Sequence, residues 1–262
     1  MRLILKVFIL TFFSSSMAIA ISLSEFIVPL TDESKRVFIG NKAESDAFVD
    51  ITIDRVFDAG MSDEKKEKFN TGDNPEEFGL IVPATAVVIP AQDRKYISLI
   101  PTQSQSEDEE RVFLVTVTPF EGMRNGKQYT ADSKVQAGVK IIFSYQIKVI
   151  QLPKSIDHNL QIKELNKTET GTEIQLINQG NVYERVAIAL LCPSSEKAPN
   201  MENVFYDTNT DKNSKCKDVG AAFLYPNNTQ DYTVPKGNTL YLLIRRIKES
   251  VSTWPVKTYK AS

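Results

Sequence analysis

The amino-acid sequence predicts an all-β protein built from two β-sandwiches that are joined near residues 152–158. Short runs rich in valine, isoleucine, phenylalanine, tyrosine and threonine recur along the chain, and turn-forming residues separate them. Six or seven such runs fall on each side of Pro153, which is the number typical of a sandwich of the immunoglobulin type. Only the segment 61–70 has a helical composition. These observations favour two sandwich domains over a mixed fold.

We expect residues 1–20 to be removed before the protein folds. They begin with the basic residues Arg2 and Lys6, continue with the apolar run 7–13 and end in an A-x-A motif at Ala20. This order is typical of a secretory signal peptide that is cleaved near Ala20. The alternative, a membrane anchor, is disfavoured because the apolar run is too short to span a bilayer and no stop-transfer pattern follows. We therefore expect an exported, soluble mature chain.

The first predicted domain covers residues 21–153. Its strands are predicted at 34–40, 46–57, 79–90, 95–101, 111–120 and 139–152. Each of these runs combines β-branched and aromatic residues and is bounded by glycine, proline or polar turn residues. The segment 61–70 (MSDEKKEKFN) lacks an apolar stripe, so it is interpreted as a charged helical insertion on the surface of this domain.

The second predicted domain covers residues 154–262. Its strands are predicted at 159–165, 172–178, 182–192, 221–225, 230–234 and 239–247, with a marginal strand at 254–260. No internal repeat links this domain to the first, so the two halves are expected to share an architecture without sharing a sequence.

The charge of the chain excludes several classes of function. The 31 basic and 33 acidic residues nearly balance, and no dense basic stripe is present, so nucleic acid is not an expected partner. The two charge runs at 63–69 and 106–110 are interpreted as solvated surfaces. The sequence contains no nucleophile elbow, no zinc-protease motif, no P-loop and no dinucleotide-binding motif, so neither catalytic residues nor a cofactor are expected.

Two cysteines, Cys192 and Cys216, are the only ones in the chain. In an exported protein such a pair is interpreted as a disulfide, which would close a loop of about 25 residues. Two free thiols are the alternative, and they would fit a cytosolic protein better. A metal site is not expected, because two cysteines and one histidine do not make a set of zinc ligands. That histidine, His158, is predicted to be an ordinary surface residue beside the linker.

The most apolar segment of the mature chain is GVKIIFSYQIKVIQLP, residues 138–153. Side chains alternate along a strand, so one face of it is wholly apolar. That face carries Val139, Ile141, Phe143, Tyr145 and Ile147. One interpretation is that this face packs in the sandwich core. The other is that it stays partly uncovered until another protein binds to it.

Several segments together resemble the periplasmic chaperones of the chaperone–usher pilus pathway. IIFSYQIKVIQLP is similar to the family's strand of alternating apolar residues that leads to a lysine, here Lys148, and then to a proline, here Pro153. ERVFLVTVTPFEG (110–122), LIVPATAVVIPAQDRKYISLI (80–100) and SKRVFIGNKAESDAFVDITI (34–53) resemble the preceding strands of the family in order. The resemblance covers most of residues 25–153 and is weaker beyond, where QLINQGNVYERVAI (175–188) resembles the start of the second domain.

The resemblance implies two immunoglobulin-like sandwiches set at an angle, with a cleft between them, in a protein of the periplasm. Such a chaperone donates its own strand to the groove of a pilus subunit that lacks its last strand, and it delivers the subunit to an outer-membrane usher. The implied donor residues are Val139, Ile141, Phe143 and Tyr145. Whether the free protein self-associates to cover this strand is left open.

The resemblance also implies a pair of cations that binds the C-terminal carboxylate of the subunit in the interdomain cleft. Lys148 corresponds to the family's lysine, and Arg36 is chosen as its arginine, with Lys35 as the rival. Two solvated cations at strand ends are the alternative interpretation of Arg36 and Lys148.

Two segments depart from the family pattern. The segment 121–138 is longer than in chaperones that serve rod-like pili, which indicates a long-loop or alternate class, and the insertion at 60–78 has no counterpart in the pattern. A protein of another class, an exported immunoglobulin-like structural or adhesive surface protein, is the alternative function. A pilin is less favoured, because it usually has one sandwich and needs a longer N-terminal extension than ISLSEFIVPL (21–30).

Overall fold

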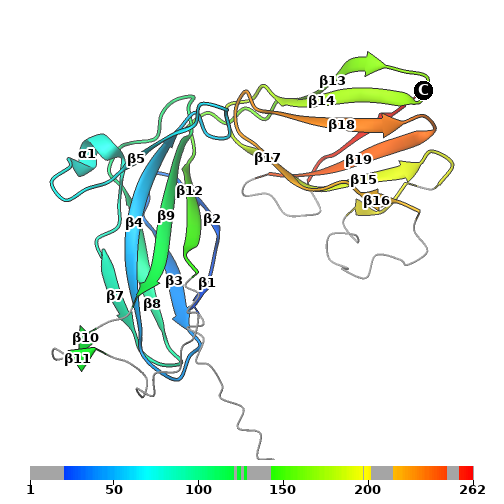
Figure 1. The fold of residues 1–262 in the computed structure, drawn as a ribbon. Coiled ribbons are helices and arrows are strands. Elements are labelled where there is room, and N and C mark those ends of the chain that lie inside the picture. Colours follow the sequence, from blue (N-terminus) through cyan, green and yellow to red (C-terminus); the bar gives the residue numbers. More distant parts are fainter. Residues whose placement is uncertain are drawn as a thin grey trace, which may run out of the picture.

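A computed structural model describes most of the chain after residue 20. The described residues are 21–120, 123–124, 127–128, 143–196, 198–201, 215–246 and 254–261. The predicted signal peptide, 1–20, lies outside them. Within these ranges, no helix has both the length and the apolar character that a membrane span requires. The described strands form two β-sandwiches that meet at one end and are set at an angle, as the sequence and the resemblance predicted (Figure 1).

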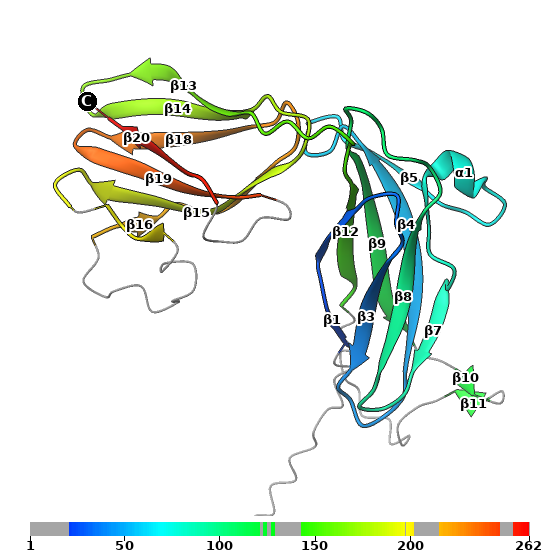
Figure 2. The ribbon, with the colours of Figure 1, turned by 180° about the vertical axis from the view of Figure 1, so that it is seen from behind.

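The first sandwich has two facing layers. One layer contains, in spatial order, β1 (Ile21–Leu23), β3 (Lys35–Asn41), β8 (Arg94–Pro101) and β6 (Leu80–Ile81). The other contains β2 (Ile27–Leu30), β12 (Tyr145–Gln151), β9 (Arg111–Phe120), β4 (Ala47–Phe57) and β5 (Lys65–Lys68), and β7 (Ala86–Ile89) also pairs with β4. Figure 2 shows β1, β3 and β8 in front of the second layer.

The core of this sandwich follows from the period of two along its strands. Every second residue of β3, β4, β9 and β12 points inward. Fully or almost fully buried among them are Val37, Ile39, Val49, Ile51, Phe113, Val115, Val117, Ile147 and Val149. The intervening residues face outward, and three of those near the junction, Val112, Leu114 and Ile150, pack against the second sandwich.

The first strand of the mature chain crosses between the two layers. β1 pairs antiparallel with β3, and β2 pairs parallel with β12. No strand was predicted over 21–30, because a run of ten residues that contains a proline carries little strand signal. The pairing of β2 matters for the site, because it covers only the C-terminal part of β12.

The predicted helix at 61–70 is wrong. Lys65–Lys68 is instead the edge strand β5, which pairs with β4 and exposes all four side chains. A charged edge strand of this kind resists pairing with other chains. The one helix described in this insertion, α1 (Pro75–Phe78), begins after Asn74, whose side-chain oxygen accepts a hydrogen bond from the Glu76 amide, and ends at Gly79.

The predicted single strand at 79–90 is two short strands. Leu80 and Ile81 pair with β8 in one layer, whereas β7 pairs with β4 in the other. Pro83 lies where the chain crosses between the layers, and its missing amide hydrogen prevents a continuous strand there.

The second sandwich also has two layers. One contains β13 (Leu160–Lys167), β14 (Gly171–Asn178) and β18 (Thr229–Pro235). The other contains β16 (Lys217–Asp218), β15 (Glu184–Pro193), β19 (Asn238–Arg245) and β20 (Val256–Lys260), and β17 (Ala222–Leu224) also pairs with β15. The predicted disulfide between Cys192 and Cys216 is present.

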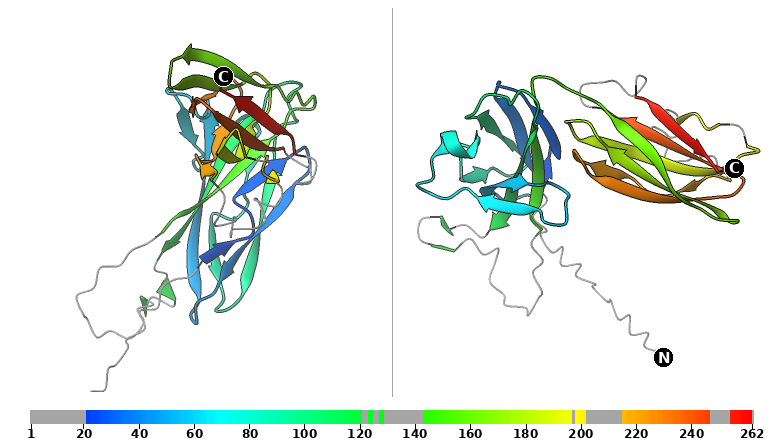
Figure 3. Two further views of the ribbon diagram at one scale, coloured as in Figure 1. Left: turned by 90° about the vertical axis from the view of Figure 1, so that its right-hand side faces the viewer. Right: turned by 90° about the horizontal axis from the view of Figure 1, so that it is seen from above.

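The remaining described strands are β10 (Met123–Arg124) and β11 (Lys127–Gln128), which pair with each other within the long segment after β9. The rest of 121–138 lies outside the described residues, as do Val139 and Ile141. The strand predicted at 139–152 is therefore described as β12 from Tyr145 onward. The right-hand view of Figure 3 shows the two sandwiches side by side as seen from above.

Candidate functional site at the junction of the two sandwiches

An apolar cluster that draws on both sandwiches forms the junction. The first sandwich contributes Val56, Val112, Leu114, Ile150 and Leu152, and the second contributes Val182, Tyr183 and Tyr225. All of these side chains are buried. The junction is therefore a packed interface rather than a tether, which limits the relative motion of the two domains.

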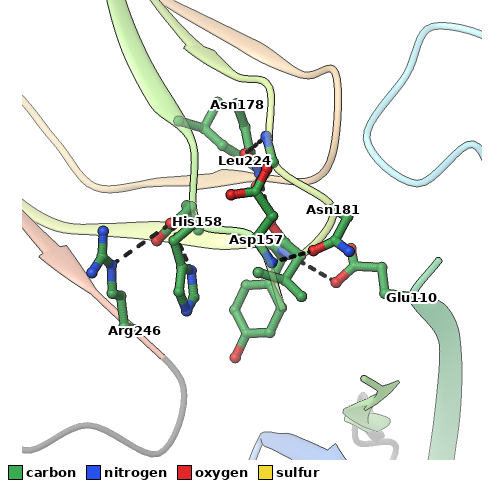
Figure 4. Close-up of polar contacts among 11 residues, drawn as sticks. Glu110, Asp157, His158, Asn178, Asn181, Leu224 and Arg246 are labelled. Atoms are coloured by element: carbon green, nitrogen blue, oxygen red, sulfur yellow. Dashed lines mark hydrogen bonds and ion pairs between the residues drawn. The ribbon is translucent and has the colours of Figure 1, made fainter. Parts of the chain in front are cut away.

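Polar contacts reinforce this interface (Figure 4). The Asn181 side chain accepts a hydrogen bond from the Asp157 amide at 2.7 Å and donates one to the Ser155 carbonyl at 2.7 Å. The Glu110 carboxylate accepts a hydrogen bond from the Tyr183 amide at 2.8 Å. The Asn181 bonds fix the linker onto the loop that precedes β15, and the Glu110 bond fixes the first sandwich onto the same loop.

The charge run 106–110 is not wholly solvated as the sequence predicted, and Glu110 is the exception. Its carboxyl is largely buried, and this burial raises its pKa to about 7 although the Tyr183 hydrogen bond and the charge of Lys148 act in the opposite direction. Its second oxygen has no hydrogen-bond partner in the part of the chain that the structure describes. Glu110 is thus a carboxyl group whose charge is costly at neutral pH.

His158 is not the ordinary surface residue that the sequence predicted. Its Nδ1 lies 2.9 Å from a carboxylate oxygen of Glu184, which is completely buried (Figure 4). Arg246 lies on the same carboxylate, with its Nε 3.9 Å from the oxygen. A histidine and a glutamate separated by 26 positions carry no sequence pattern that would have predicted this contact.

The insertion after β4 also reaches the second sandwich. The Asn228 side chain donates a hydrogen bond to the Ala59 carbonyl at 3.2 Å, and Ala59 packs against the apolar cluster. The next residue, Gly60, has φ 75°, and a side chain there would collide with Asn228. The start of the insertion 60–78 therefore helps to set the angle between the two sandwiches.

A polar cleft of about 740 Å³ opens beside this contact. Its walls come from both sandwiches and include Arg55, Glu110, Asp157, Asn181 and Tyr225. The described residues contain no group of three or more histidine, cysteine or acidic side chains that could hold a metal ion.

Lys148 lies on the face of β12 that is turned toward the second sandwich. Its neighbours Ile147 and Val149 point into the core, so its own side chain points outward, and its amide donates to the Phe26 carbonyl at 2.8 Å. The ammonium lies 4.9 Å from the ring centroids of both Phe223 and Tyr225. Burial is the main cause that lowers the pKa of Lys148. Among the described residues its ammonium forms no ion pair, so it is available to an incoming anion.

The structure does not bring Arg36 to Lys148. Arg36 lies on β3, in the other layer, and its side chain is exposed because Val37 on the opposite face fills the core. The two cations therefore lie on opposite outer faces of the first sandwich. The rival residue Lys35 forms an ion pair with Glu25 at 3.0 Å.

The apolar face of β12 changes from buried to exposed along the strand. Val149 and Ile147 are completely buried, Tyr145 is half-buried against the core, and Phe143 is 67% exposed. Val139 and Ile141, the other two predicted donor residues, lie outside the described residues.

Among the described residues, no strand pairs with this edge of β12 before Lys148. β2 pairs with Lys148–Gln151 and not with the residues before them, and the Lys148 amide points toward β2. Because hydrogen-bonding groups alternate between the two sides of a strand, the backbone N–H and C=O of Gln146 point to the same side, past the end of β2. An open edge and an exposed apolar side chain therefore coincide.

Comparison with known proteins identifies the fold. No family model and no curated protein sequence matches the chain. The solved structure of the class 5 fimbriae chaperone CfaA is 17% identical with a TM-score of 0.56, covering 91% of this chain and 98% of that chain. The YadV chaperone is 14% identical with a TM-score of 0.53, covering 91% and 98%. A chain of the CsuC–CsuE chaperone–tip adhesion subunit pre-assembly complex from archaic Csu pili of Acinetobacter baumannii is 13% identical with a TM-score of 0.53, covering 92% and 97%. The chain thus has the fold of fimbrial chaperones over nearly its whole length.

Proposed function

We propose that the protein is a periplasmic chaperone that caps fimbrial subunits and passes them to an outer-membrane usher. In this proposal the segment 1–20 directs export and is cleaved near Ala20. The fold that the chain shares with fimbrial chaperones supports the class of function. The function requires binding surfaces and no catalytic group.

The proposal rests on the unpaired edge and the exposed apolar face of β12. Its open edge at Gln146 can extend the sheet by one strand, because the backbone groups there have no partner from β2. Its apolar face continues beyond the core through Tyr145 to the exposed Phe143. A client sandwich that lacks a strand would satisfy both features at once, since it has a free sheet edge and a hydrophobic groove. Val139 and Ile141 would extend the donated face.

Lys148 would bind the C-terminal carboxylate of the client. The ammonium is half-buried between the two sandwiches and lies over the rings of Phe223 and Tyr225. A carboxylate placed there would form a charge-assisted hydrogen bond in a setting with little water, where such a bond is strong. The anchor would fix the register of the donated strand, because it ties the end of the client to one position beside β12.

Co-expression with a fimbrial subunit encoded near the gene tests this function. We expect a soluble one-to-one complex that contains the subunit, and we expect Lys148→Ala to abolish its recovery while the variant keeps the wild-type circular dichroism spectrum. Arg36→Ala is the matched control, because it removes a cation from the opposite face of the same sandwich. Recovery of the protein only as a monomer or a homopolymer with every nearby subunit would contradict the proposal and favour a structural or adhesive protein.

A further inference from the structure

A row of three side chains crosses the outer face of the second sandwich at the junction. Phe223 on β17 is directly opposite Arg185 on β15, and Arg185 is directly opposite Arg245 on β19. Residues that are directly opposite on neighbouring antiparallel strands point to the same face of the sheet. That face is the outer one, because Val186, the next residue of β15, is completely buried in the core.

The ring of Phe223 links this row to the first sandwich. The Arg185 guanidinium lies 5.1 Å from its centroid, and the Lys148 ammonium lies 4.9 Å from the same centroid. One aromatic ring is thus shared by two cations that come from different domains. Phe223 remains 38% exposed, so part of the ring is open to a molecule that enters the junction.

Neither cation has a directly paired carboxylate within the described part of the chain. Arg185 and Lys148 form no ion pair there, and the Nε of Arg185 is buried without a hydrogen-bond partner. Burial lowers the pKa of Arg185, and the nearby charge of Arg245 lowers it further. Arg245 itself lies over the ring of Trp254 at 5.5 Å, which holds it to its own sheet.

The charges of two carboxylates, Glu64 and Glu110, act on Lys148, but neither forms an ion pair with it. Glu64 accepts a hydrogen bond from the Gly60 amide at 2.9 Å and pairs with Lys66 at 3.4 Å. Glu110 accepts its bond from the Tyr183 amide. Lys148 and Arg185 share a ring and lie next to a third cation, Arg245, so a directly bound anion would stabilise this arrangement.

We propose that Arg185 is the second cation of the carboxylate site, so that the C-terminal carboxylate of the client is bound between Lys148 of the first sandwich and Arg185 of the second, at the edge of Phe223. This inference rests on the proposed function and places the second cation on the second domain instead of at Arg36. A guanidinium suits the role because its N–H groups can bind both oxygens of a carboxylate. The site exists only when the two domains are docked, so carboxylate binding and the interdomain angle are coupled.

A small carboxylate tests the site without a fimbrial subunit. The probe is N-acetylglycine, which carries a free carboxylate after a peptide group, and N-acetylglycinamide is its uncharged control. We expect N-acetylglycine to shift the Nε–Hε NMR signal of Arg185 in a saturable manner, and the amide to leave it in place. The shift should be lost in Lys148→Ala and retained in Arg36→Ala. An unchanged Arg185 signal at saturating probe, or equal shifts with the amide, would overturn the proposal.

Capture of a co-expressed subunit then separates this inference from the proposed function. We expect Arg185→Ala to weaken subunit binding about tenfold or more, as the loss of a charged hydrogen bond does, and Arg185→Lys to restore part of it. If the wild-type protein captures the subunit and Arg185→Ala captures it equally well, the inference fails and the chaperone function stands. If the wild type captures no subunit but the probe still shifts Arg185, the carboxylate site stands and the chaperone function fails.

Discussion

Replacement of Glu110 by glutamine should remove a pH dependence of stability that the junction creates. Burial raises the pKa of Glu110 from 4.5 to about 7, so the folded protein binds a proton that the unfolded chain releases between these two values. A raised carboxyl pKa adds stability at pH values below 4.5, and this contribution is lost as the pH rises through about 7. A pKa shift of this size lowers the free energy of unfolding by about 3 kcal/mol as the pH rises from below the unfolded pKa to above the folded pKa.

The side chain of a glutamine at position 110 carries no charge at any pH, and its oxygen can still accept the hydrogen bond from the Tyr183 amide. Its free energy of unfolding relative to the wild type should therefore increase by about 3 kcal/mol between pH 4.5 and about pH 8.5. Any fixed cost of burying the new amide nitrogen cancels in this difference. Urea unfolding of both proteins across the pH range measures it, and the ¹³C shift of the Glu110 carboxyl reports its pKa directly. Parallel pH profiles of the two proteins, or a Glu110 pKa near 4.5, would refute the reasoning.

Three further outcomes are expected. Gly60→Ala should loosen the contact of the insertion with the second sandwich and change the interdomain distances measured by small-angle scattering. Gly72→Ala is the control, because Gly72 also has a positive φ but has open space around it, and it should leave these distances unchanged. Equal effects of the two variants would contradict a role for this contact. Loss of the Cys192–Cys216 disulfide in the double serine variant should lower the free energy of unfolding by about 3 kcal/mol, and a change below about 0.5 kcal/mol would contradict this. Phe143→Ser should change stability by no more than about 0.5 kcal/mol, because the side chain is largely exposed, yet reduce subunit capture; capture at the wild-type level would remove Phe143 from the donated face.

Periodicity predicted most of the fold, because it reports burial. The strand β4 alternates clearly, β9 alternates over much of its length and β19 is a nearly continuous apolar run, and each was predicted within a few residues of its observed bounds. The strand β5 was missed because its four exposed residues have no apolar face, and only its pairing with β4 makes it a strand. The helix α1 was missed although Asn74 before it and Gly79 after it are typical helix boundaries.

The site was predicted only in part. Lys148 could be proposed because the strand around it has a strong pattern and ends at Pro153, and its role stays a prediction. Arg185 and Phe223 could not be identified, because their contact with Lys148 depends on how two separate sandwiches dock. Arg36 was chosen from the order of residues along the chain, and such an order does not reveal which of the two layers a strand will join.

Hydrogen exchange at β12 tests the central claim most directly. The amide of Gln146 points to the open edge, past the end of β2, whereas that of Ile147 points to β9. In a complex with a fimbrial subunit the exchange of the Gln146 amide should slow by at least about tenfold, because the client strand would accept its hydrogen bond, while Ile147 remains protected in both states. Exchange of Gln146 at the same rate in the free and the bound protein would show that β12 does not donate its edge.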